Sequence, residues 1–267
     1  MSTSFEDSCS LAIASNGANQ PMKQFLKRRL DRLLASWGKE LAPLGTTSGW
    51  NRLSPVAVAL KPLIEQSDSQ LRQDLFVLNE VGFKLGGYFV EFGGTDGIVM
   101  SNTLLLERQF GWNGIIAEPA RCWHAKLRDN RRCHIETACV WRDSTSTLWF
   151  TETDASELST ITAFNESDFH SAARGAGRTY DVATISLNDL LAKYDAPREI
   201  DYLSIDTEGS EFDILECFDF GRHDFRVITC EHNYSSTREK VHRLLSGHGY
   251  ERKYAELSKW DDWYVRP

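Results

Sequence analysis

Short apolar runs alternate with amphipathic segments from residue 88 to the end of the chain. Strands are predicted at residues 88–92, 114–118, 134–140, 201–206, 225–231, 250–257 and 261–267. Helical periodicity is found between them, at residues 101–110, 121–130, 210–218 and 236–249. Strands that alternate with helices are typical of βαβ units, so we expect an α/β fold with a mostly parallel sheet. The last two strands are close in sequence, which favours an antiparallel hairpin at the sheet edge.

The N-terminal region has a different pattern. Residues 1–20 are rich in Ser, Asn and Ala and predict a disordered segment. Residues 21–37 place apolar side chains near one helical face and basic ones on the other. One interpretation is a helix packed on the main domain or on a partner, and the other is weak peripheral contact with an anionic membrane surface. We therefore predict a disordered and helical extension over residues 1–68 and a folded domain over residues 69–267.

Composition and charge narrow the classes of function. The 267 residues are 41% hydrophobic and 25% charged, which is ordinary for a globular protein. The formal net charge is −8, which argues against a nucleic-acid partner because an acidic surface repels phosphates. No run approaches the ~18 apolar residues of a membrane span. The six cysteines form no CxxC pair and the N-terminus lacks an apolar signal core, so we expect a cytoplasmic protein.

The stretch "FVEFGGTDG" carries the first candidate site. Glu91, Gly93 and Gly97 form E-x-G-x-x-x-G directly after a predicted strand, where α/β folds bind nucleosides. The spacing is not G-x-G-x-x-G, and no Walker lysine follows, so a pyrophosphate cradle is not indicated. An acidic strand end suits a cationic ligand such as S-adenosylmethionine, and Glu118 at the second strand end can accept hydrogen bonds from a ribose. The alternative is an ordinary turn with a solvent-facing glutamate.

Longer blocks of the sequence resemble a known family. Residues 73–119, from "QDLFVLNEVGF" to "GIIAEP", together with "DYLSIDTEGSEFDILECFDF" and "VITCEHN", are similar to the FkbM family of S-adenosylmethionine-dependent methyltransferases. The similarity extends from about Ser69 to the C-terminus. It implies a Rossmann-like class I methyltransferase fold, with a mostly parallel seven-stranded sheet, an antiparallel edge hairpin and the N-terminal helical extension outside it.

The resemblance also implies an activity. Members transfer a methyl group from S-adenosyl-L-methionine to a hydroxyl group, and the expected acceptors are sugars or glycans. A polyketide-type natural product is the alternative acceptor. A catalytically silent cofactor-binding module is the non-enzymatic alternative, and a nucleotide-dependent oxidoreductase is disfavoured because the dinucleotide glycine spacing is missing.

The matching motifs imply which residues bind the cofactor. Ser101 and Asn102 are among them, but either could instead cap the next helix, and the two interpretations stay open. The aspartate common after the third strand of many methyltransferases is missing near Ala138, which leaves backbone groups for the adenine. The cofactor-binding residues implied by the resemblance are Glu91, Gly93, Gly94, Gly97, Ser101, Asn102, Thr103, Glu118, Pro119 and Ala138.

The chemical step needs a group that removes the proton of a poorly nucleophilic alcohol. Asp206 follows the fourth parallel strand, and Glu231, His232 and Asn233 follow the fifth. The carboxyl ends of these strands face one crevice, so the catalytic candidates are Asp206, Glu231 and His232. His232 could be the general base. Asp206, Glu231 and Asn233 could instead hold Mg²⁺ through oxygen atoms.

Other residues near the fourth strand have two interpretations. Asp206 could be structural and fix the turn at Gly209. Glu208 and Glu211 could extend the acidic cluster, or they could favour a helix N-terminus electrostatically.

Two further features concern the acceptor. The connection from about Thr153 to Tyr180 is long, which is typical of lids and binding loops. A tryptophan in the cleft could stack on a sugar face, but the sequence alone does not select one of the eight tryptophans.

Overall fold

The structure is a computed structural model. The predicted disordered segment at residues 1–20 and the predicted amphipathic helix at residues 21–37 lie outside the described part. The residues that the structure describes are 59–153, 159–164 and 177–267.

One compact unit begins at Leu60 and contains all of the described residues except Ala59. Leu60 is 0% exposed. Ser67 Oγ donates to Asp74 Oδ1 at 2.7 Å, which ties the segment before the first long helix to that helix. The division of the chain between residues 68 and 69 stays a prediction.

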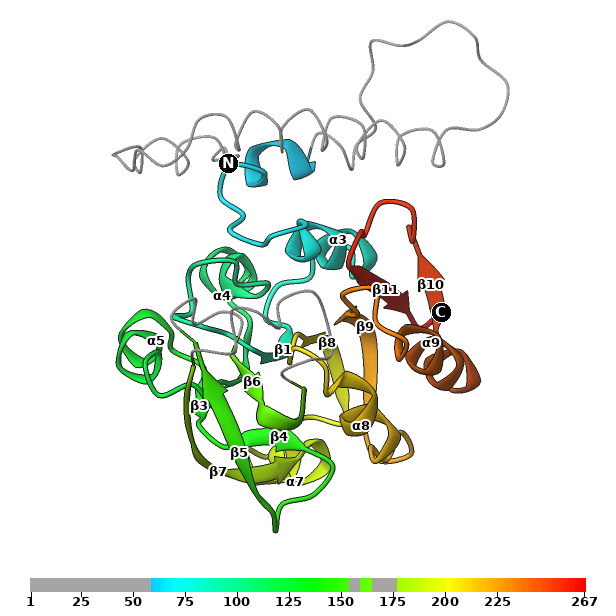
Figure 1. The fold of residues 1–267 in the computed structure, drawn as a ribbon. Coiled ribbons are helices and arrows are strands. Elements are labelled where there is room, and N and C mark those ends of the chain that lie inside the picture. The colour runs from blue at the N-terminus through cyan, green and yellow to red at the C-terminus, as the bar shows by residue number, and fades with distance from the viewer. Residues whose placement is uncertain (1–58, 154–158, 165–176) are drawn as a thin grey trace, which may run out of the picture. The chain divides into compact units, whose positions relative to one another are not determined.

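Helices and strands alternate along most of this unit (Figure 1). The elements are η1 (Lys61–Leu63), α3 (Gln73–Glu80), β1 (Tyr88–Phe92), α4 (Leu104–Phe110), β2 (Asn113–Ala117), α5 (His124–Asn130), β3 (His134–Glu136), β4 (Cys139–Trp141), β5 (Thr147–Glu152), β6 (Thr160–Ile161), η3 (Thr162–Phe164), β7 (Arg178–Ser186), α7 (Leu187–Lys193), β8 (Glu199–Ile205), α8 (Glu211–Glu216), β9 (Asp224–Glu231), α9 (Arg238–Gly247), β10 (Glu251–Lys253) and β11 (Asp261–Val265). Among the described residues, β3 to β6 follow one another without a helix between them.

A seven-stranded sheet forms the centre of the domain, in the order β10-β11-β9-β8-β1-β2-β3. β8, β1, β2 and β3 pair in parallel, and so do β8 and β9. β11 is antiparallel to both β9 and β10. The prediction of an α/β fold with a large, mostly parallel sheet and an antiparallel edge pair is therefore confirmed.

Helices cover both faces of this sheet. On one face, apolar residues of α7, α8 and α9 pack on the strands in a single core cluster that includes Leu190, Leu215 and Leu245. On the other face, Phe76 of α3 stacks on Trp263 of β11, with ring centroids 4.7 Å apart. The sheet is thus buried on both sides, as its nearly continuous apolar strands require.

A second, four-stranded sheet has the order β4-β7-β5-β6. The sequence pattern predicted one strand at residues 134–140, and this was wrong. β3 and β4 belong to different sheets, because Glu136 Oε1 accepts hydrogen bonds from the backbone N–H groups of Thr137 and Ala138 and turns the chain there. The second sheet was not predicted. It has its own apolar cluster, formed by Ala120, Cys139, Phe150, Ile161 and Val182.

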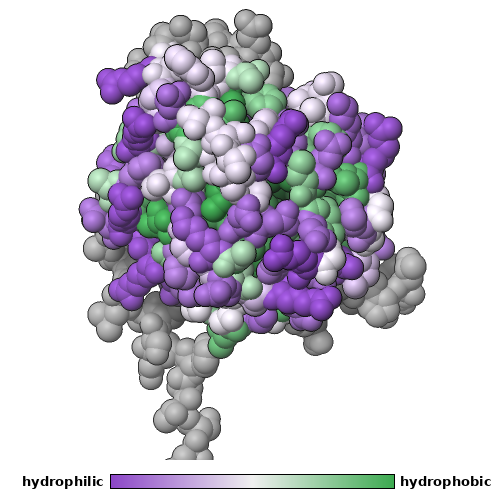
Figure 2. All heavy atoms as spheres, turned by 90° about the horizontal axis from the view of Figure 1, so that it is seen from below, coloured by the Kyte–Doolittle hydropathy of each residue, from purple (hydrophilic) through white to green (hydrophobic). Residues whose placement is uncertain are grey.

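The surface in Figure 2 is mainly hydrophilic, with apolar side chains in small separate groups. Within the described residues, the helices are too short or too polar to cross a bilayer.

Candidate functional site

One pocket of about 480 Å³ lies at the carboxyl ends of the central parallel strands. Glu91, Ala117, Ile205 and Glu231 line it from β1, β2, β8 and β9. The chain runs outward from β1 to β2 and β3, and then returns to β8 and β9 on the other side of β1. The pocket therefore lies at a topological switch point, where open α/β sheets bind ligands.

Gly93 brings the loop after β1 close to the end of β8. Its φ is +75°, and a Cβ atom placed there would lie 2.3 Å from the backbone oxygen of Asp206. Only glycine accommodates both the left-handed backbone and this approach. Gly93 lines the pocket.

The other two glycines of the loop pack against side chains. A Cβ atom at Gly94 would lie 2.3 Å from Ile116 Cγ2, and one at Gly97 would lie 2.6 Å from Arg131 Cγ. Neither glycine is among the lining residues. The structure therefore gives both a packing role in the loop.

Glu91 organises the S-N-T block. Its carboxylate accepts hydrogen bonds from the backbone N–H of Asn102 at 2.7 Å and from the hydroxyl groups of Ser101 and Thr103. Arg131 Nη1 lies 3.6 Å from Glu91 Oε2, and both side chains are buried. Much of the hydrogen-bonding capacity of the Glu91 carboxylate is thus taken up by other groups of the protein, although Glu91 also lines the pocket.

The S-N-T residues have different positions. Asn102 lines the pocket, but Ser101 and Thr103 do not. Ser101 Oγ accepts from the N–H groups of Thr103 and Leu104 at 3.3 and 3.2 Å, so it caps the start of α4. The geometry of Ser101 thus agrees with helix capping, which was one of the two interpretations that the sequence left open for this residue.

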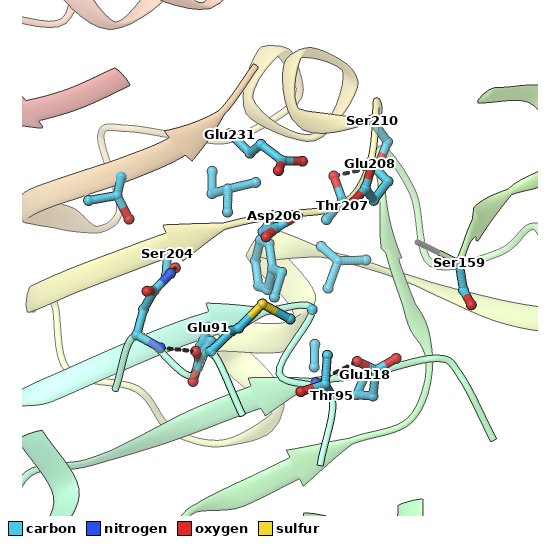
Figure 3. Close-up of a pocket in the computed structure, with 18 of the residues that line it drawn as sticks. Glu91, Thr95, Glu118, Ser159, Ser204, Asp206, Thr207, Glu208, Ser210 and Glu231 are labelled. Atoms are coloured by element: carbon cyan, nitrogen blue, oxygen red, sulfur yellow. Dashed lines mark hydrogen bonds between the residues drawn. The ribbon is translucent and has the colours of Figure 1, made fainter. Parts of the chain in front are cut away.

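Glu118 follows β2 and faces the loop after β1 (Figure 3). Its Oε2 accepts from the N–H of Thr95 at 2.9 Å, and its Oε1 accepts from the N–H of Ala120 at 2.8 Å. The side chain is 5% exposed. Burial raises the pKa of Glu118 to about 7, against the opposing effect of the two backbone donors.

Apolar side chains form the wall next to Glu118. Pro119, Val140, Phe150 and Ile161 line it, and the last three belong to the unpredicted second sheet. Ala138 is not among the lining residues, whereas its neighbours Cys139 and Val140 are. The segment that the sequence indicated for the adenine therefore reaches the pocket through Cys139 and Val140, and the role of Ala138 stays a prediction.

Three carboxylates gather at the ends of β8 and β9. Asp206, Glu208 and Glu231 each offer an oxygen atom within 4.8 Å of the others. Burial raises the pKa of Asp206 to about 6, and the neighbouring Glu231 carboxyl group opposes this rise. Burial and the charge of Asp206 hold the pKa of Glu231 well above its ordinary value. The cluster can accept a proton or hold a divalent cation.

Glu208 and Glu211 are separated by the turn after β8. Glu208 joins the acidic cluster, as one sequence interpretation expected. Glu211 Oε1 instead accepts from the N–H groups of Thr207 and Gly209 at 3.1 and 2.9 Å. It therefore stabilises the loop that carries Glu208.

The two residues after Glu231 lie differently. Asn233 lines the pocket, and its Nδ2 donates to Glu208 Oε2 at 3.4 Å. His232 does not line the pocket. Its Nδ1 accepts from the N–H of Tyr234 at 2.9 Å, and its Nε2 lies 3.8 Å from Asp262 Oδ1. Burial lowers the pKa of His232 to about 4. The structure thus brings Asp206 and Glu231 together but does not bring the imidazole to them.

Sequence reasoning missed one end of the pocket. Its side chains come from α3, the loops and the strand ends of β8, β9 and β11, and they carry no local motif. They are Gln70, Gln73, Ser204, Thr229, Trp260 and Asp261.

The charged residues among the described lining residues are all acidic. Among the described residues that line the pocket, none is Lys, Arg or His. The acidic lining residues are Glu91, Glu118, Asp206, Glu208, Glu231 and Asp261. Such a site complements a ligand with a positive charge.

Comparisons with known proteins agree with the sequence resemblance. The model of the methyltransferase FkbM domain family matches residues 91–254. Among curated proteins, none matches the chain in sequence.

Solved structures give distant likenesses. Methyltransferase FkbM from Methylobacillus flagellatus is 13% identical with a TM-score of 0.43, and the match covers 67% of this chain and 43% of that one. A precorrin-6y C5,15-methyltransferase from Geobacter metallireducens is 12% identical with a TM-score of 0.38, and the match covers 68% of this chain and 72% of that one. The chain thus spans less than half of the FkbM structure that it matches.

Proposed function

The chain belongs to the methyltransferase FkbM domain family, and from this premise we propose that it is an S-adenosylmethionine-dependent O-methyltransferase. The observation that carries the proposal is Glu118 at the end of β2, opposite the glycine turn after β1 in one pocket. A buried carboxylate there suits two ribose hydroxyl groups.

The remaining walls fit the same cofactor. The apolar side chains of Pro119, Val140, Phe150 and Ile161 suit an adenine ring. The acidic lining suits the sulfonium and ammonium groups. When bound, S-adenosylmethionine supplies the methyl group, so that an O–C bond replaces the S–C bond and S-adenosylhomocysteine is left.

The acids after β8 and β9 can activate the acceptor. Asp206 and Glu231 offer carboxylate oxygen atoms within 4.8 Å of each other, so the pair can take up the proton that the acceptor hydroxyl loses. A carboxyl group with a pKa near the working pH is well suited to this task. We therefore assign proton removal to the Asp206–Glu231 pair.

A metal route uses the same residues. Asp206, Glu208 and Glu231 provide oxygen donors within 4.8 Å of one another, which fits Mg²⁺. The ion would supply Lewis-acid stabilisation of the alkoxide. Asn233, predicted as a ligand, directs its amide toward Glu208 in this structure.

We infer that the acceptor hydroxyl belongs to a sugar or glycan, and that a polyketide-type product is the alternative. The polar side chains that line the pocket on the far side of Asp206 from Glu118 support a sugar or glycan. We also propose a cytoplasmic location, because the spacing of the six cysteines fits no small disulfide scaffold.

Calorimetry with S-adenosylmethionine and with NAD tests the cofactor. We expect binding of the first and none of the second. Methyl transfer from radiolabelled S-adenosylmethionine to a panel of sugars then tests the activity, since a silent module would bind the cofactor without turnover. Binding of NAD alone would contradict the proposal.

A further inference from the structure

Arg131 lies behind the loops that frame one side of the pocket. It directly follows α5, and its side chain is 0% exposed. Arginine is almost never fully buried in proteins unless it is paired. Arg131 does not line the pocket, so its contacts with other residues indicate its role.

The guanidinium group of Arg131 donates hydrogen bonds to four groups. Its Nη1 donates to the backbone oxygen of Gly97 at 3.2 Å and to Ser101 Oγ at 3.0 Å. Its Nη2 donates to Thr103 Oγ1 at 2.8 Å, and its Nε donates to Glu107 Oε2 at 3.0 Å. One side chain therefore joins the end of α5 to the glycine loop after β1, to the S-N-T block and to α4.

These contacts also direct the hydroxyl groups of Ser101 and Thr103 toward Glu91. A guanidinium group can only donate, so each hydroxyl oxygen accepts from Arg131 and keeps its own hydrogen for the Glu91 carboxylate. Arg131 Nη1 also lies 3.6 Å from Glu91 Oε2. A buried carboxylate is costly unless it is paired and hydrogen-bonded. Arg131 thus pairs with Glu91 and orients the groups that donate to it.

Glu91 lies beside the position that we propose for the ribose. Glu91 and Glu118 are at the carboxyl ends of the neighbouring strands β1 and β2 (Figure 3). If the ribose binds Glu118 and the adenine faces the apolar wall, the methionine part of the cofactor extends toward Glu91 and Asn102, which both line the pocket. A carboxylate there suits the ammonium group of the methionine part.

We propose that Arg131 is a positioning residue for the methionine part of S-adenosylmethionine. It fixes the Glu91 carboxylate and the S-N-T block from behind, without lining the pocket itself. This inference rests on the proposed methyltransferase function, because that function places an amino-acid group beside Glu91. Loss of Arg131 should therefore weaken ligands that carry the amino-acid group more than ligands that lack it.

Two probes distinguish this role from general support of the fold. S-adenosylhomocysteine carries the amino-acid group, whereas 5′-methylthioadenosine has the same adenosine and sulfur atom without it. Calorimetry on the full chain at pH 8 measures both affinities, and it requires no acceptor.

Arg131→Met removes the guanidinium group and keeps an unbranched side chain. It should weaken S-adenosylhomocysteine by ~10- to 100-fold, the usual cost of losing hydrogen bonds to charged groups. The affinity for 5′-methylthioadenosine should change by less than about 3-fold. Arg131→Lys keeps the charge but not the planar fork, so it should show the same selective loss at roughly 3- to 10-fold. The lysine variant carries the test if Arg131→Met does not fold.

Two further variants are controls. Arg132→Met removes the neighbouring arginine, which is exposed, and should bind both probes like the wild type. Glu118→Gln should weaken both probes alike, since both carry the ribose.

Equal losses for the two probes in the Arg131 variants would overturn the inference, because Arg131 would then support the fold without selecting the methionine part. Unchanged affinity for S-adenosylhomocysteine in these variants would overturn it as well. A wild-type chain that binds neither probe would instead refute the proposed function.

Discussion

The hydroxyl group of Thr160 donates to the backbone oxygen of Glu208 at 3.1 Å. It also reaches the backbone oxygen of Thr207, at 3.3 Å. Thr160 lies in β6 of the second sheet and is 1% exposed, while Glu208 has a left-handed φ of 58° in the loop after β8. The second sheet thus holds the loop that carries an acid of the cluster, at a residue whose backbone is strained.

Thr160→Val keeps the shape of the side chain and removes this donor. We expect kcat to fall by roughly 3- to 10-fold, because small displacements of a catalytic loop weaken alignment. The affinity for S-adenosylmethionine should stay within about 3-fold, since a lost hydrogen bond of ~0.5–1.5 kcal/mol here does not touch Glu118. Steady-state kinetics and calorimetry give the two quantities.

Thr160→Ser is the matched variant, because it keeps the hydroxyl group and removes only a methyl group. It should restore most of the kcat that Thr160→Val loses. Equal losses in the two variants would mean that packing, and not the hydrogen bond, determines the effect.

Glu118 gives a prediction about pH. Its pKa is raised to about 7 by burial, so its ionised fraction rises about 10-fold from pH 6 to pH 8. If the ionised form binds the ribose, the affinity for S-adenosylmethionine should rise by about that factor over the same range. Glu118→Gln should abolish the rise, and it should weaken binding by ~10- to 100-fold at pH 8. Calorimetry across pH measures both.

Asp261 supplies the control for this experiment. Its pKa is also raised to about 7 by burial, but it lines the pocket from the start of β11, on the other side of β8 from Glu118. Asp261→Asn should therefore keep the pH dependence of cofactor binding. A profile that disappears in Asp261→Asn and persists in Glu118→Gln would remove Glu118 from the ribose site.

Gly93 gives a prediction about the loop. In Gly93→Ala, the new Cβ would lie 2.3 Å from the backbone oxygen of Asp206, at a φ of +75°. We expect loss of cofactor binding, because the loop must move away from β8, together with a lower melting temperature. The left-handed backbone alone costs ~1–2 kcal/mol. Thermal unfolding and calorimetry report the two effects.

Gly111→Ala separates the effect of a left-handed backbone from the effect of the steric clash at Gly93. Gly111 has a φ of +65°, and no atom lies within 4 Å of an added Cβ. It should lose similar stability from the backbone but bind the cofactor normally. Normal binding by Gly93→Ala would contradict the contact that the structure shows.

Local patterns predicted β1, β2, β8 and β9 because each of these strands contains a short apolar run. They also predicted Glu118 and Asp206, since each directly follows such a run. Of the glycines predicted to bind the cofactor after β1, the structure places Gly93 in the lining, and its need for glycine has a source that the local pattern does not show. The clash of an added Cβ is with the backbone of Asp206, which is distant in sequence.

Long-range contacts explain what the sequence did not reveal. Gln73 and Asp261 are separated by 188 positions, and their hydrogen bond depends on how α3 packs on the sheet. β5 and β7 pair as Leu148 with Val182 across a long connection, and neither strand has a distinctive local pattern. Such pairings depend on the folded topology, so one sequence does not show them.

The last prediction concerns the chemical step. Asp206→Asn and Glu231→Gln should each lower kcat by ~10²–10⁴-fold, the usual share of acid–base catalysis. Cofactor affinity should change much less. His232→Ala should cost less than 10-fold, since the imidazole lies outside the lining and burial lowers its pKa to about 4. A large loss of kcat in His232→Ala, with cofactor affinity intact, would restore the histidine as the base that the sequence indicated.

Glu208→Gln distinguishes the two routes, because Glu208 belongs to the cation-binding set but not to the Asp206–Glu231 pair to which we assign proton removal. With proton removal by Asp206 and Glu231 alone, EDTA should leave turnover unchanged and Glu208→Gln should have a modest effect. With a required metal, EDTA should stop turnover, Mg²⁺ should restore it, and Glu208→Gln should cost as much as Asp206→Asn. Full activity of all three acid variants in EDTA would mean that the acceptor hydroxyl is activated elsewhere in the pocket.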